Sequence, residues 1–153
     1  TPGWRFGHQS LKTAASRALL PGHSKLQASL DRLREIADAL DEASSQLAVP
    51  LILEANDVIA RDIVEHERDD ESNVYPRIAN ILHDAPGLVA MSRAHREILH
   101  LSRLLLRLSN GLKIEAVDKY LIRDAQRVIE SIESLVRMHN AQEDDIYEQV
   151  ASG

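Results

Sequence analysis

Histidine and carboxylate side chains recur at a four-residue spacing in two places along the chain. His66 and Asp70 stand in the segment EHERDDESNVYP, residues 65–76, and His139 and Glu143 stand in HNAQEDDIYE, residues 139–148. Residues four apart share one face of an α-helix, so each pair could bring an imidazole and a carboxylate to the same point. These two groups are ligands for iron, manganese and zinc. The pairs therefore indicate candidate metal ligands.

The first pair lies inside an apolar helical stripe. Because each helical residue turns about 100°, Asp70 falls about 40° from His66, and three isoleucines fall within about 60° of it. These are Ile52, Ile59 and Ile63. Glu67 lies at about 100°, on the border of the stripe. We expect the remaining acids of the segment to face water: Glu65, Asp69 and Glu71.

The second pair lies in a similar stripe. Four apolar residues fall within about 20° of His139, and Glu143 falls at about 40°. The apolar residues are Leu121, Ile132, Ile146 and Val150. Asp144, at about 140°, lies off the stripe. Buried charge without a partner costs several kcal/mol, so something must compensate the inward groups of both pairs.

Three further histidines differ in the faces on which they lie. His95 lies in line with apolar residues and points inward, whereas His23 lies near the edge of an apolar stripe. His100 has mostly charged helical neighbours, and we expect it to point outward. These neighbours are Arg96, Glu97, Arg103, Leu104 and Arg107.

The elements that must position these side chains are four helices. The apolar spacing predicts one helix at about 22–46 and a second after SSQLAVP that ends near 73, or near 83 past a kink at Pro76. Two more follow at about 87–108 and about 114–149. Four long helices with short connections predict an all-α fold, an antiparallel up-and-down four-helix bundle over residues 16–150, preceded by an N-terminal arm at 1–15. In such a bundle His23, His66, His95 and His139 fall towards one end.

Composition excludes several classes of protein. The net charge is −6, which argues against a nucleic-acid-binding surface. No apolar run approaches the roughly 20 residues that span a membrane, and no signal peptide is evident, so we expect a cytoplasmic protein without a membrane partner. The chain has no cysteine, which excludes thiolate metal sites. Any metal must be held by histidine, aspartate or glutamate.

The inward residues together form a set of nitrogen and oxygen donors from all four helices. Six such ligands are more than one tetrahedral zinc ion needs. Two carboxylates on different helices could bridge two metal ions, as in other bundle-core sites. We therefore favour a di-iron centre with open positions for O₂, NO or peroxide. A single zinc or iron ion, or a metal-free network of buried hydrogen bonds, is the alternative.

The chain resembles the hemerythrin-like, or HHE cation-binding, family over the span of the four helices. HERDDESNVYP matches the family pattern H-x-x-x-E-E-x-x-[LV]-[FY]-P, with Asp70 in place of the first glutamate. HNAQEDDIYE, AHREIL and GHSKLQASL resemble the fourth, third and first helices. The resemblance implies a left-handed bundle with a non-haem di-iron centre. It implies that Asp70 and Glu143 are the bridging carboxylates. It also implies that one iron is held by His23 and His66, and the other by His95 and His139.

The chain departs from the oxygen-carrying members at two points. They have H-x-x-x-x-D on the fourth helix, a spacing that Asp144 would satisfy in place of Glu143. They also have H-x-x-x-H on the third helix, whereas His100 here comes one residue late. Either a π-bulge turns His100 inward, or one iron binds water or another carboxylate such as Glu67. We favour the second interpretation.

These features predict a protein that binds or senses O₂, NO or iron, or that handles iron and peroxide. We expect a binding or sensing protein rather than an enzyme, with a homo-oligomer or a fused or partner signalling domain as its setting. Two alternatives remain open. One is a helical interaction module that is metal-free or holds a single ion. The other, which rests on the resemblance alone, is repair of iron-sulfur clusters.

Overall fold

The computed structural model describes residues 23–82, 86–113 and 117–152, and all of its regular elements are helical. The all-α prediction is confirmed, and no strand occurs within these ranges. The expected N-terminal arm, residues 1–15, lies outside the described residues. The elements are α2 (His23–Ala39), α3 (Ser45–Val58), η1 (Ile59–Val64), α4 (Glu65–Asp69), η2 (Asp70–Val74), α5 (Tyr75–Leu82), α6 (Pro86–Asn110) and α7 (Lys119–Ser152).

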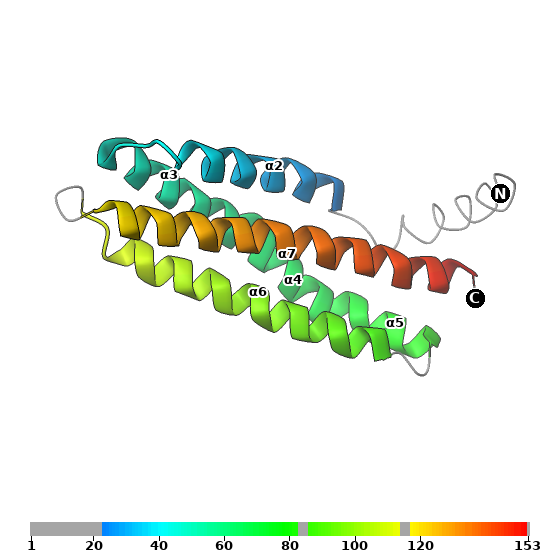
Figure 1. The fold of residues 1–153 in the computed structure, drawn as a ribbon. Helices are drawn as coiled ribbons and strands as arrows, with labels where there is room; N and C mark the ends of the chain where they lie inside the picture. The colour runs from blue at the N-terminus through cyan, green and yellow to red at the C-terminus, as the bar shows by residue number, and fades with distance from the viewer. Residues whose placement is uncertain (1–22, 83–85, 114–116, 153) are drawn as a thin grey trace, which may run out of the picture.

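Four helical rods lie side by side (Figure 1). The elements from α3 to α5 follow one another without a break, and we call residues 45–82 the second rod. Helix α7 packs against both α6 and α2, and the second rod packs against α2 and α6 as well. Across the described ranges, no helix has an apolar stretch that could cross a bilayer.

Two helix boundaries differ from the predicted ones, and a side-chain cap marks the start of a helix near each. The first helix ends at Ala39 rather than near 46, and Ser44 then accepts a hydrogen bond from the Leu47 backbone N–H to begin α3. At the start of α7, Asp118 accepts a hydrogen bond of 2.9 Å from the Leu121 backbone N–H. Each cap satisfies an N–H that the first turn leaves without an intrahelical partner.

The apolar core consists of two clusters of unequal size. The larger one runs along most of the four rods and includes Leu33 and Ile132, both fully buried. The smaller one lies toward the other end and has six buried members: Val74, Tyr75, Ile78, Leu88, Met91 and Tyr147. Along each of the last three rods, a histidine lies between residues of the two clusters. His66, for example, lies between Ile63 and Val74.

The second rod contains two π-helical segments, η1 and η2. Segment η2 ends directly before Tyr75, whose backbone N–H bonds to the carbonyl of Asp70, five residues back. Pro76 follows, and its ring would clash with the carbonyl four residues earlier in a regular α-helix. The wider π turn relieves that clash, so the helix continues to Leu82 past the proline.

Candidate metal centre

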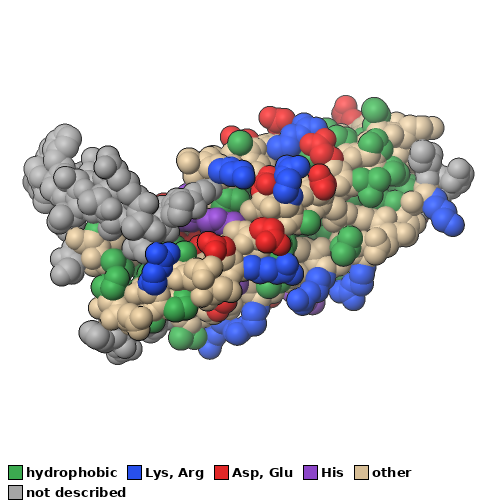
Figure 2. Space-filling model, turned by 180° about the vertical axis from the view of Figure 1, so that it is seen from behind, with side chains coloured by type: hydrophobic (Ala, Val, Ile, Leu, Met, Phe, Trp, Pro, Cys, Tyr) green, Lys and Arg blue, Asp and Glu red, His purple; other side chains and the backbone are tan. Residues whose placement is uncertain are grey.

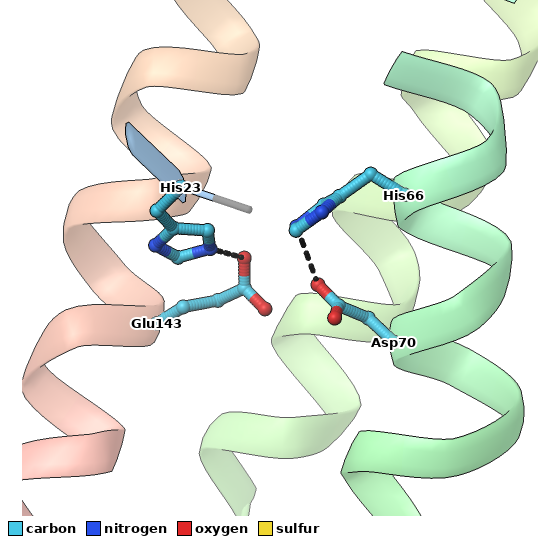
Figure 3. Close-up of side chains that lie close together, drawn as sticks. All are labelled: His23, His66, Asp70 and Glu143. Carbon is cyan, nitrogen blue, oxygen red and sulfur yellow. Dashed lines mark ion pairs between the residues drawn. The ribbon is translucent and has the colours of Figure 1, made fainter. Parts of the chain in front are cut away.

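A group of four possible ligands comes from three of the four rods. His23 opens α2, His66 and Asp70 come from the second rod, and Glu143 comes from α7. Figure 3 shows the four side chains pointing toward one another between the helices. His66 Nε2 lies 3.1 Å from Asp70 Oδ2, and His23 Nε2 lies 3.6 Å from Glu143 Oε1. Asp70 and Glu143 are buried, whereas the two imidazoles are partly exposed.

A second group of three ligands is fully buried. Its members are Glu67, His95 and His139, from α4, α6 and α7. Glu67 Oε2 lies 2.6 Å from His95 Nε2 and 3.2 Å from His139 Nε2. Glu143 Oε1 lies 3.1 Å from His139 Nε2, so this carboxylate reaches imidazoles of both groups. The two groups therefore form one continuous polar cluster inside the bundle.

Two buried tyrosines of the smaller apolar cluster contact the polar cluster. The hydroxyls of Tyr75 and Tyr147 each donate a hydrogen bond of 3.0 Å to Glu143 Oε2. The Tyr75 hydroxyl also lies 2.9 Å from His95 Nε2 and 3.3 Å from His139 Nε2. Glu143 is thus oriented by two phenols, and one of them lies beside both imidazoles of the buried group.

An outer carboxylate fixes the other side of the His95 ring. Glu71 Oε2 lies 2.7 Å from His95 Nδ1, and Ser92 Oγ donates a hydrogen bond of 2.8 Å to Glu71 Oε1. When Nδ1 carries the proton, the Nε2 lone pair faces Glu67, as histidine ligands with a carboxylate behind them commonly do. Glu71 is exposed, as expected, but the sequence did not predict that its side chain also reaches back to the His95 ring.

Several buried polar atoms of the cluster have no hydrogen-bond partner within the described residues. They are His66 Nε2, both carboxylate oxygens of Glu67, Asp70 Oδ2, His139 Nδ1 and Glu143 Oε1. Most of them lie close to other site atoms, yet without the geometry of a hydrogen bond. Buried groups of this kind are rare in native proteins. A cation among them would satisfy them together, so the donor set fits a metal.

Neighbouring carboxylates raise the pKa values of His23 and His139. Burial lowers the pKa of His23, but its contacts with Asp144 and Glu143 outweigh burial and raise the pKa to about 9. Burial also lowers the pKa of His139, and its contacts with Glu143 and Glu67 raise the pKa to about 9. A metal must therefore displace protons from these two rings.

The pKa values of Asp70 and Glu143 are shifted in opposite directions. Burial raises the pKa of Asp70 to about 6, although His66 beside it acts the other way. Burial also raises the pKa of Glu143, but contacts with His139 and His23 outweigh it and hold that pKa below its usual range. Glu143 is therefore an anion at neutral pH, which suits a ligand shared between two cations.

The structure places all six residues predicted as metal ligands in these two groups. They are His23, His66, Asp70, His95, His139 and Glu143. Of the three additional candidates, Glu67 is buried at 1% exposure within the cluster. Asp144 Oδ1 lies 3.4 Å from His23 Nδ1, on the ring nitrogen that faces away from Glu143. His100 lies exposed on α6, which is α-helical throughout.

Tyr75 is a site residue that helix arithmetic places on the wrong face. On a straight α-helix it falls about 180° from His66, on the opposite face. The π turn of η2 changes the register by accommodating an extra residue, and Tyr75 is buried at 6% exposure against the histidines. The proline at position 76 is the one sequence signal that such an irregular turn precedes it.

The described residues form helices, and the core between them holds two sets of histidine and carboxylate ligands. These features define a helical protein with a candidate metal centre. The profile of the hemerythrin HHE cation binding domain matches residues 15–151, so the chain belongs to this family. No curated protein and no solved structure matches the chain.

Proposed function

We propose that the protein holds two iron ions in the polar cluster and binds or senses a small diatomic ligand, O₂ or NO. The observation that carries this proposal is the pair of adjacent donor groups, whose buried atoms lack hydrogen-bond partners. We also propose that the rods form the antiparallel up-and-down bundle of the family. The packing of each rod against its neighbours in the chain supports that order.

The two groups suggest which residues hold each ion. His23, His66 and Asp70 would hold one ion, and Glu67, His95 and His139 would hold the other. Glu143 would bridge them, because its Oε1 lies near His23 of the first group and His139 of the second. Asp70 as a second bridge rests on the family resemblance. Glu67 would take the position left by the missing fifth imidazole.

The chain's own residues orient the ligands and keep water out. Tyr75 and Tyr147 hold Glu143 through its Oε2 and leave its Oε1 for a cation. Glu71 orients His95, and the two apolar clusters flank the site. When bound, an iron pair supplies coordination of a diatomic molecule and one-electron chemistry. The partly exposed His23 and His66 mark the side of the site that faces solvent.

Metal content tests this proposal directly. Protein purified under iron-replete, chelator-free conditions should contain about two irons per chain, and its oxidised form should absorb in the near-ultraviolet and visible range. His139→Ala should remove metal from the buried group, whereas the matched His100→Ala on the exposed face of α6 should retain both ions. A folded protein that holds no iron under these conditions would contradict the proposal.

A site with a single metal ion is the second candidate function. The two ligand groups differ in size and exposure, which favours a single ion over a metal-free interaction module. The first group offers four ligands and is reachable from solvent, while the second offers three in a fully buried position. A stoichiometry near one that is insensitive to Glu67→Gln would establish a mononuclear site in the first group.

A further inference from the structure

The outward face of α6 carries an uninterrupted row of basic side chains in an acidic protein. Arg93, Arg96, His100, Arg103 and Arg107 are all exposed, and helical geometry places them within about 80° of one another. The row is about 21 Å long. We call these five residues the α6 basic stripe. Figure 2 shows Lys and Arg side chains following the lower edge of the molecule, where α6 lies.

The arginines of the stripe differ from most described arginines of the other helices, of which Arg77 alone bonds to a backbone carbonyl instead of an acid. Within the described ranges, none of the four lies within ion-pairing distance of a carboxylate, and Glu97 is the single acid of α6. Seven arginines elsewhere each pair with an acid: Arg32, Arg34, Arg61, Arg68, Arg123, Arg127 and Arg137. Like charges three or four residues apart destabilise a helix. The stripe is therefore an unfavourable arrangement that an external anion would relieve.

A cavity with one apolar side opens directly beside the stripe. It has a volume of about 260 Å³ and lies between α6 and the second rod. Val64 from η1 and Leu99 and Leu106 from α6 belong to its apolar side, and Arg103 belongs to both the cavity and the stripe. Its polar side includes Glu65, which pairs with Arg68. Leu106 is 51% exposed, so an apolar group could reach it from solvent.

We propose that the α6 basic stripe and this cavity form a docking site for an acidic helical segment of a partner protein. Acidic side chains of the segment pair with the arginines, and one apolar side chain enters the cavity. A helix of about 14 residues matches the length of the stripe. Helix-in-groove recognition combines an apolar anchor with flanking charges in this way.

A nucleic acid or an anionic membrane fits these observations less well. Phosphate groups supply charge for the arginines, but a duplex has no apolar side chain to place between Val64 and Leu106. The net charge of −6 also repels a polyanion before contact. A short acidic helix carries few charges and one anchor, so both objections fall away. The cavity lies farther along α6 than His95, and none of the candidate metal ligands lines it.

A designed peptide tests the proposal. The probe is a helical peptide of about 20 residues with glutamates spaced three and four apart and one central leucine. Its affinity for the purified full chain is measured by fluorescence anisotropy. Arg103→Gln/Arg107→Gln should weaken binding about tenfold or more. The matched control, Arg123→Gln/Arg127→Gln, removes the same charge at the same spacing from paired arginines on α7 and should change binding by less than about twofold.

Two further measurements test the apolar anchor and the class of partner. A peptide with glutamine in place of the leucine should bind about tenfold more weakly if the cavity holds the anchor. Glutamine keeps helix propensity, and circular dichroism checks that each variant folds. Equal losses in both arginine pairs would overturn the proposal, as would unchanged binding of the leucine-free peptide or no binding by the wild-type chain. Tighter binding of duplex DNA or phosphatidylglycerol vesicles through the same arginines would overturn it in favour of that partner.

Discussion

The metal-free protein should lose stability as the pH rises from 6.5 to 9. His23 and His139 have folded-state pKa values of about 9, against an ordinary value of 6.5. The folded protein therefore holds these two protons more tightly than the unfolded chain does. The resulting stabilisation is fully present below pH 6.5 and is lost as the pH passes through 9.

The size of the effect follows from the two pKa differences. A displacement from 6.5 to about 9 is worth up to about 3 kcal/mol for each histidine. Both rings contact Glu143, so the two contributions do not add in full. We expect a loss of about 3–5 kcal/mol between pH 6.5 and pH 9, a large part of the stability of an ordinary domain.

Metal loading should remove this pH dependence. Coordination requires neutral imidazole, so the loaded protein has no proton on these rings to lose, and it also gains stability by mass action. The assay is urea unfolding at pH 6.5, 7.5, 8.5 and 9, with and without metal. His139→Gln should reduce the slope of the metal-free protein, while His100→Gln should leave it unchanged. Equal slopes with and without metal, or a metal-free protein as stable at pH 9 as at 6.5, would refute the reasoning.

Three other variants test single contacts of the site. Glu67→Gln removes the one carboxylate of the buried group, so elemental analysis should find about one iron per chain instead of two; two irons would contradict the ligand assignment. Tyr75→Phe removes a hydrogen bond to the charged Glu143 and should lower the unfolding free energy of the metal-free protein by about 1–3 kcal/mol, measured in urea. Glu71→Ala leaves His95 without its carboxylate and should weaken metal affinity about tenfold to a hundredfold in a chelator competition; unchanged affinity would show that the contact is incidental.

The periodicity of apolar residues predicted the helices and the inward faces because both depend on the regular turn of an α-helix. The stripe around His139 belongs to the uninterrupted helix α7, and His139 and Glu143 lie at 0% and 1% exposure as that stripe indicates. The ends of helices depend instead on single side chains. Ser44 and Asp118 decide where α3 and α7 begin, and apolar periodicity carries no information about either cap.

Most parts of the site that periodicity did not predict lie in the second rod; Tyr147 on α7 is the exception. Glu67 seemed to lie on a border because the arithmetic assumed a straight helix, yet π segments stand on both sides of α4. They change the register on each side of His66, so Glu67 is buried with its neighbours and Tyr75 faces the histidines. Glu71 was missed for another reason. Its backbone faces outward, but its long side chain returns to His95.

The polar cluster lies between the two apolar clusters. We therefore expect the packing of the smaller apolar cluster to depend on the candidate metal site. The larger cluster is continuous and can hold the four rods together without the metal. The smaller cluster has six buried members, and two of them, Tyr75 and Tyr147, are tied to Glu143. Loss of the metal leaves unpartnered atoms beside that cluster, and removing such compensation from buried polar groups is costly. We therefore expect removal of a bound metal to disturb α5 and the C-terminal part of α7 more than the rest of the bundle.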